Sequence, residues 1–144
     1  MLSDGERLHP YAASRVVSDA VAANGATLIG DGAVCKHWLH DALRLPADAV
    51  YLTHGRFGCM GMGLGLSIGS AITIPGRPVV CVIGDGAVGF SIGEFEAMVR
   101  HRLPITIVVL NKARWARPGV SRCGRVAATV WWAPTCPTLT ITTS

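Results

Sequence analysis

Apolar residues follow two different periods along most of the chain. Short β-branched apolar runs, clearest at 79–83 and 105–110, are typical of strands covered on both faces. Further strands are predicted near 27–30 and 50–53. Apolar residues at helical spacing predict helices near 12–23, 35–43, 62–72 and 91–102. Strands that alternate with helices indicate an α/β domain with a central parallel sheet.

Composition supports one folded domain. Of the 144 residues 50% are hydrophobic, which is enough for a core. No apolar run is long enough to cross a bilayer, and the first residues lack the basic-then-apolar order of a signal peptide. The five cysteines show no paired spacing, and Cys81 falls in a predicted buried strand. We therefore expect a reduced, cytoplasmic protein without a membrane partner.

The net charge of +4 comes from the C-terminal part of the chain. Up to Asn111 there are 8 basic and 9 acidic residues, whereas from Lys112 onward there are 5 basic residues and no acidic one. The charge of the predicted domain is therefore close to neutral. It does not predict a nucleic-acid partner.

Two oxygen-bearing side chains follow neighbouring predicted strands. Asp85 lies in a Gly-Asp-Gly turn after the strand at 79–83, and Asn111 directly follows the strand at 105–110. The carboxyl ends of parallel strands share one edge of a sheet, which is where ligands bind in α/β domains. Carboxylate and amide oxygens suit Mg²⁺ that carries a diphosphate, and glycines let the backbone approach the phosphates.

This motif resembles the cofactor motif of thiamine-diphosphate (ThDP) enzymes of the acetolactate synthase, benzoylformate decarboxylase and oxalyl-CoA decarboxylase type. The resemblance covers about residues 8–115, the family's C-terminal diphosphate-binding domain, and implies a three-layer αβα fold that is incomplete at its C-terminus. It implies ThDP and Mg²⁺ as cofactors. The implied metal ligands are Asp85, Asn111 and the carbonyl of Arg114, and the implied diphosphate-binding residues are Gly84, Asp85, Gly86, Ala87 and Asn111.

A second glycine-rich segment, at 58–69, resembles the loop and helix on the pyrimidine side of the cofactor in this family. The resemblance implies that Met60 is an apolar wedge that bends the cofactor. It implies that the Gly58 carbonyl accepts a hydrogen bond from the 4′-amino group, with Cys59 in the same loop. The alternative is a helix rich in glycine and methionine that only packs closely on the sheet.

The pentapeptide Gly-Asp-Gly-Ala-Val occurs twice, at 30–34 and at 84–88. No asparagine follows the first copy at the required distance, so we interpret Asp31 as a turn or capping residue and not as a metal ligand. In relatives, side chains of this turn touch the diphosphate. Here those places hold Val34 and Cys35, so any contact must come from backbone N–H groups.

The chain departs from the family pattern at Lys112, where relatives have the asparagine whose side chain coordinates Mg²⁺. An ammonium group has no lone pair to donate and repels a cation. The resemblance also places the family's catalytic glutamate on a separate pyrimidine-binding domain, usually of a partner subunit, so we assign no catalytic residue to this chain.

We therefore expect the ThDP- and Mg²⁺-binding domain of a 2-oxo-acid decarboxylase or acetolactate-synthase-like carbon–carbon lyase or ligase, inactive alone as a fragment. Its expected partner is a pyrimidine-binding domain or subunit, in a homo- or hetero-oligomer. Three alternatives remain: the cofactor-binding subunit of a split two-chain decarboxylase, a Rossmann-like nucleotide-binding module without catalysis, and a non-catalytic interaction subunit.

Residues 116–144 do not resemble the family. They show no helix or strand period, and we expect them to be poorly ordered. One permitted back-translation, with a single G restored after the codon of Trp115, reads W-G-A-S-R-R-F-Q and later V-V-G-T, which resembles the family's continuation. The hypothesis is a frameshift near Trp115, which divides the chain into a partial domain at 1–115 and a tail at 116–144.

Overall fold

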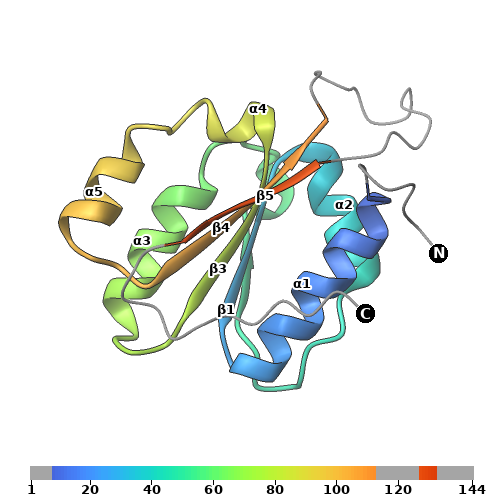
Figure 1. Cartoon of the computed structure of the whole chain (residues 1–144), viewed down its shortest axis with the longest axis horizontal. Helices are drawn as coiled ribbons and strands as arrows, with labels where there is room; N and C mark the ends of the chain where they lie inside the picture. Colours follow the sequence, from blue (N-terminus) through green and yellow to red (C-terminus); the bar gives the residue numbers. More distant parts are fainter. Residues whose placement is uncertain (1–7, 113–126, 133–144) are drawn as a thin grey trace.

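A twisted five-stranded sheet runs through the centre of the molecule (Figure 1). The computed structural model describes residues 8–112 and 127–132. The strand order is β2-β1-β3-β4-β5, in which the first four strands are parallel and β5 is antiparallel to β4. The strands are β1 (Thr27–Asp31), β2 (Tyr51–Thr53), β3 (Val79–Gly84), β4 (Ile105–Asn111) and β5 (Ala127–Trp132).

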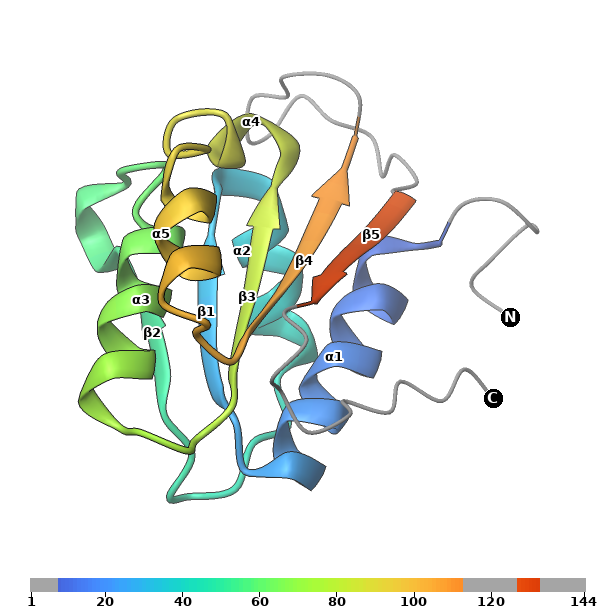
Figure 2. The ribbon, with the colours of Figure 1, turned by 60° about the vertical axis from the view of Figure 1, so that its left-hand side comes forward.

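Helices cover both faces of the sheet, which gives three layers (Figure 2). Helices α1 (Pro10–Asn24) and α2 (Ala33–Ala42) pack on one face. Helices α3 (Gly63–Thr73) and α5 (Glu94–Arg100) pack on the other. A short 3-10 helix, η1 (Gly55–Phe57), precedes α3, and the single turn α4 (Asp85–Val88) follows β3.

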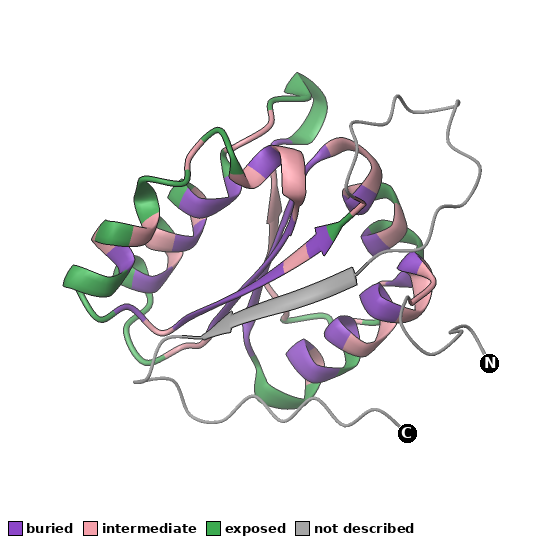
Figure 3. Cartoon of the chain, turned by 45° about the horizontal axis from the view of Figure 1, so that its top comes forward, coloured by how far each residue is buried: buried purple, intermediate pink, exposed green. Residues whose placement is uncertain are grey.

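Each strand sends alternate side chains into two separate cores, as the period of a strand requires. In β3, Val80 and Val82 pack against α1 and α2, whereas Cys81 and Ile83 pack with α3 and α5. All four are fully buried. The helices turn their buried faces to the sheet and their exposed faces outward (Figure 3). This two-sided burial explains why the strands appear in the sequence as continuous apolar runs.

The predicted α/β architecture, with its four parallel strands and four main helices, is confirmed. The largest difference in bounds lies in the helix predicted at 91–102, because α5 begins only at Glu94. Gly89 and Gly93 precede it, and glycine disfavours helix. The helix ends before Pro104, where Arg102 adopts a left-handed φ of 51° and Leu103 N–H donates to the Met98 carbonyl over 3.0 Å.

The prediction that the tail has no regular structure is wrong for Ala127–Trp132. This segment forms β5 and pairs with β4 from Thr106 to Asn111. The outer edge of β4 offers unpaired backbone N–H and C=O groups, and any extended segment rich in β-branched and aromatic residues can pair with them. The frameshift hypothesis also predicts that the edge of the strand at 105–110, or of a neighbouring strand, is left uncovered, and β5 covers this edge of β4. The rest of the tail, at 116–126 and 133–144, lies outside the described residues.

No helix in the described part of the chain combines the length and the apolar character needed to cross a membrane.

Candidate functional site

The carboxyl ends of β1, β3 and β4 meet at one edge of the sheet. Gly84 of β3 pairs with Leu110 of β4, so Asp85 and Asn111 each follow a paired position on neighbouring strands. On the other side of β3, Ile83 pairs with Asp31 at the end of β1. The prediction that Asp85 and Asn111 reach the same edge is therefore confirmed.

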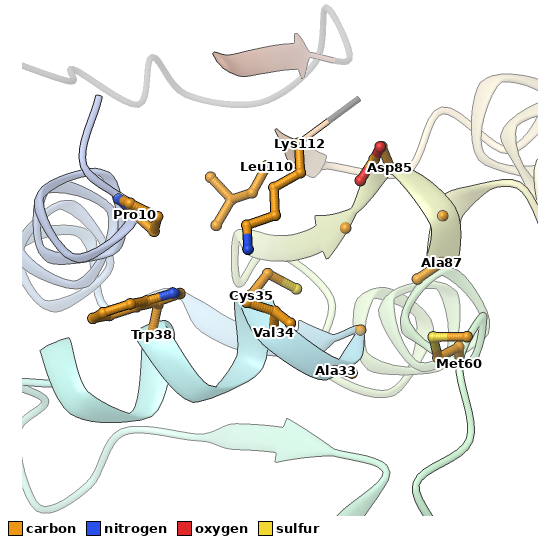
Figure 4. Close-up of a pocket in the computed structure, with 13 residues that line it drawn as sticks. Pro10, Ala33, Val34, Cys35, Trp38, Met60, Asp85, Ala87, Leu110 and Lys112 are labelled. Carbon is orange, nitrogen blue, oxygen red and sulfur yellow. The ribbon is translucent and has the colours of Figure 1, made fainter. Parts of the chain in front are cut away.

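A pocket of about 80 Å³ opens at this edge (Figure 4). Its floor is backbone: Gly32 from the turn after β1, and Gly84 and Gly86 from the turn after β3. One wall is the first turns of α2, through Val34 and Trp38. A floor of glycine backbone beside the start of a helix suits an anionic group that must approach the main chain closely.

The two Gly-Asp-Gly turns touch each other at the pocket floor. Gly32 has a left-handed φ of 97°, and a Cβ placed there would lie 2.8 Å from the Cys35 Sγ and 3.3 Å from the Gly84 nitrogen. Only glycine avoids both the strain and the overlap. The repeated pentapeptide therefore builds two adjoining turns of one site, with the first turn opening into α2 and the second into α4.

Lys112 brings a positive charge into the pocket. Its side chain extends to the side where Cys35 and Trp38 lie, away from the Asp85 carboxylate (Figure 4). No carboxylate of the described residues forms an ion pair with it. The same residues contain no group of three His, Cys, Asp or Glu side chains placed to hold a metal ion. Lys112 therefore places a positive charge in a pocket that also contains the Asp85 carboxylate.

Comparison with known proteins agrees with this geometry. Residues 27–118, more than half of the chain, match the family "Thiamine pyrophosphate enzyme, C-terminal TPP binding domain". The chain belongs to this family. It is 31% identical over 113 residues to 2-hydroxyacyl-CoA lyase 2 from Homo sapiens, a match that covers 78% of this chain and 18% of the relative. It is 34% identical over 110 residues to oxalyl-CoA decarboxylase from Escherichia coli strain K12, covering 76% of this chain and 19% of that one.

A solved structure shares the fold of this ThDP-binding domain. The Rhodococcus jostii RHA1 thiamine diphosphate-dependent 4-hydroxybenzoylformate decarboxylase superposes with a TM-score of 0.66 at 24% identity, over 76% of this chain and 20% of that protein. The chain thus spans about a fifth of the length of the relatives it matches.

Five of the residues that the sequence suggested for cofactor binding line the pocket of the ThDP-binding domain: Met60, Gly84, Asp85, Gly86 and Ala87. The others do not. Gly58 and Cys59 are exposed in the loop before α3, and Asn111 is exposed at the end of β4, one residue before the pocket-lining Lys112. Arg114 lies outside the described residues.

The buried cysteines of the domain are neutral thiols. Cys35 lies beside the pocket and donates from Sγ to the Asp31 carbonyl over 2.6 Å. Burial raises the pKa of the Cys35 thiol to about 12, and burial likewise raises the pKa of the Cys81 thiol to about 12. A raised pKa disfavours the thiolate, which is the form of cysteine that acts as a nucleophile or a metal ligand.

Pro10 and Trp38 are among the apolar residues of the pocket that sequence reasoning missed. Trp38 lies four residues after Val34 and so on the same face of α2, a spacing that could have indicated a shared wall. Its ring packs edge-on against His9, with ring centroids 5.2 Å apart. Pro10 begins α1, and only the packing of α1 beside α2 brings it to the site, which no local pattern shows.

The structure confirms that Asp31 is a capping residue. Its Oδ2 accepts hydrogen bonds from the backbone N–H groups of Gly61 and Gly63, the latter being the first residue of α3. The side chain is only 1% exposed and is not among the residues that line the pocket.

Proposed function

We propose that this chain binds the diphosphate end of thiamine diphosphate in the pocket at the carboxyl ends of β1, β3 and β4. The observation that carries the proposal is the joint floor made by Gly32 and Gly84, where a Cβ at Gly32 would lie only 3.3 Å from the Gly84 nitrogen of the neighbouring turn. The site lies within the residues that match the family.

Each part of the pocket contributes in a different way. The N-cap residue of α2 is Gly32, which has no side chain to cap the helix, so backbone N–H groups of the first turn can face phosphate oxygens, and the helix dipole favours negative charge there. The backbone of Gly84, Gly86 and Ala87 forms the facing side, and the Lys112 ammonium adds a full positive charge. Met60 bounds the pocket at the end nearest α3, as expected for a side chain beside the pyrimidine ring.

A divalent cation fits this pocket less well than a diphosphate does. Asp85 is the carboxylate available in the pocket, and we propose that Asn111 and the carbonyl of Arg114 are the other protein ligands of Mg²⁺. The ammonium of Lys112 reaches into the same pocket and opposes a cation there.

At the level of reaction class, we propose the cofactor-binding part of a 2-oxo-acid decarboxylase or acyl-CoA-lyase-like enzyme. Bound ThDP supplies carbanion stabilisation, and the protein supplies binding and orientation. The proposed partner is a pyrimidine-binding domain or subunit that brings the activating glutamate. Free, buried Cys35 and Cys81 support the further proposal of a reducing, cytoplasmic location.

Calorimetric titration of the 144-residue chain tests this function. With Mg²⁺ present, ThDP and inorganic diphosphate should both bind, weakly, whereas thiamine without phosphates should not, because the contacts are made to the diphosphate. Asp85→Asn should weaken ThDP binding, and Asp48→Asn, an exposed carboxylate outside the pocket, should leave it unchanged. Binding of thiamine as tight as that of ThDP, or binding of a nicotinamide dinucleotide in place of ThDP, would contradict the proposal.

The isolated chain should not decarboxylate 2-oxo acids at any concentration of ThDP. Its own pocket contributes no group that we assign to activation of the cofactor. Product formation should appear only after a pyrimidine-binding domain of a relative is added. Turnover by the purified chain alone, measured by release of CO₂, would show that the activating group lies within these 144 residues.

We also propose that residues 116–144 are read out of frame. The family match ends at residue 118, close to the proposed boundary, and acidic residues are absent from the tail. The coding DNA should yield the family's continuation when one base is inserted near the codon of Trp115. If neither shifted frame contains such a continuation, the frameshift is excluded and a split two-chain enzyme becomes the better explanation.

A further inference from the structure

Asp31 is a buried charged side chain without an ionic partner among the described residues. It is 1% exposed, and the described ion pairs are Arg15 with Asp19 and Arg100 with Glu96, both far from it in the sequence. Burying a carboxylate is unfavourable unless its charge is compensated. The hydrogen bonds that the Asp31 carboxylate accepts therefore compensate its burial and indicate its role.

Both carboxylate oxygens accept hydrogen bonds from backbone N–H groups. Oδ1 accepts from Gly32 over 2.5 Å, within the turn that leads into α2. Oδ2 accepts from Gly61 over 2.9 Å and from Gly63 over 2.7 Å, residues 30 and 32 positions away in the chain. One carboxylate thus joins the first Gly-Asp-Gly turn to the segment that directly follows Met60.

Two glycines let the loop before α3 pack closely at this place. A Cβ at Gly63 would lie 2.7 Å from the Asp31 Cβ and 3.0 Å from its Oδ2. A Cβ at Gly61, whose φ is 89°, would lie 2.6 Å from the Cβ of Phe90. Glycine at Gly63 thus leaves the room that Asp31 occupies, and glycine at Gly61 leaves room for Phe90.

A charged acceptor fixes the orientation of the loop's N–H groups as well as the position of the loop. Charge-assisted hydrogen bonds are shorter and stronger than neutral ones, and the start of α3 favours a negative charge. An apolar side chain could pack against the loop without loss of solvation, but it would not orient two N–H groups. An asparagine would accept with one oxygen only and would turn its NH₂ group towards an N–H donor.

We propose that Asp31 is a positioning residue. It holds the loop at 58–62, here called the Met60 loop, at a fixed place relative to the two Gly-Asp-Gly turns at 30–32 and 84–86. The pyrimidine end and the diphosphate end of the cofactor site are thereby set by one side chain. This inference rests on the proposed function, because the pyrimidine end and the diphosphate end of the site are defined by where ThDP would bind.

The test compares ThDP with inorganic diphosphate in Asp31→Asn. The ratio of the two affinities, measured by calorimetry with Mg²⁺, should change because only ThDP reaches the Met60 loop. ThDP affinity should fall about tenfold, whereas diphosphate affinity should change less than about twofold. Amide hydrogen exchange at Gly61 and Gly63 should accelerate about tenfold or more, while exchange in β3 stays slow.

Ser67→Ala is the matched control. Ser67 is fully buried, and its hydroxyl donates to the Gly63 carbonyl over 2.6 Å, so its loss perturbs the same helix start without touching the N–H groups that Asp31 holds. The control should lower stability in urea and leave the ThDP-to-diphosphate ratio unchanged. An equal change of the ratio in both variants, or an equal loss of both ligands in Asp31→Asn, would overturn the positioning role.

Hydrogen exchange in the wild-type chain keeps the inference testable if Asp31→Asn does not fold. The amides of Gly61 and Gly63 should be protected without any ligand, and free exchange at both would overturn the proposal. Calorimetry and hydrogen exchange test the two claims separately. If neither ThDP nor diphosphate binds in the titrations, the proposed function fails. The protection of the Gly61 and Gly63 amides then still decides the role of Asp31.

Discussion

Gly63→Ala should destabilise the domain by about 3 kcal/mol, the range found for overpacking combined with disturbance of a buried polar contact. The added Cβ would meet three atoms: the Asp31 Cβ at 2.7 Å, the Asp31 Oδ2 at 3.0 Å and the Cys81 Sγ at 3.1 Å. Both neighbours are buried, so neither can move aside into solvent. Urea unfolding followed by circular dichroism should show a lower midpoint with an unchanged slope.

Gly65→Ala, in the same helix, is the control for this substitution. Nothing lies within 4 Å of a Cβ at Gly65, and the residue is exposed. The substitution should stabilise the domain by about 0.5–1 kcal/mol, because alanine is the better helix former. A similar loss of stability in the two variants would mean that helix propensity, and not the contact with Asp31, decides the effect at Gly63.

Lys112→Asn should increase ThDP affinity in the presence of Mg²⁺ by at least about tenfold, or about 1.4 kcal/mol. The substitution removes a positive charge from the pocket that also contains Asp85 and replaces it with an amide oxygen that can bind a cation. With a chelator in place of Mg²⁺, the order should reverse, because the wild-type ammonium then remains to balance the diphosphate. Calorimetric titrations with and without Mg²⁺ measure both effects.

Lys36→Asn makes the same change of charge on α2, outside the pocket lining, and should alter neither titration. Long-range electrostatics would act on both variants alike, whereas a local role concerns Lys112 only. If the Mg²⁺ dependence of Lys112→Asn equals that of the wild type, Lys112 has no part in the cation site and the carboxylate of Asp85 must be balanced in another way.

The sheet and one side of the site could be predicted because they follow from local pattern. A β-branched run ending in Gly-Asp-Gly indicates a buried strand with a turn at its carboxyl end, and the pairing of Gly84 with Leu110 follows from the parallel arrangement. The function of Asp31 could be predicted only as far as capping. Its acceptor role for Gly61 and Gly63 depends on contacts 30 and 32 residues away, for which the sequence contains no period.

The errors have a different origin. Ala127–Trp132 pairs with β4 through backbone hydrogen bonds, which depend little on the identity of the side chains. The absence of a family resemblance in this segment therefore did not exclude a strand. The bounds of α5 were overestimated because apolar spacing continues through Gly93, whereas the helix does not. Lys112 was recognised as a departure from the family, but its direction into the pocket comes from the structure.

The position of β1 between β2 and β3 affects the order in which the domain can assemble during synthesis. Strand β1 cannot be enclosed on both sides until the ribosome has released the chain through Gly84, and loop closure over such separations is slow. Until then the apolar faces of β1 and the adjoining helices stay exposed to chaperones and proteases. Strand β5 lies after β4 in the chain, so its pairing with β4 is the last pairing of this sheet that synthesis makes possible.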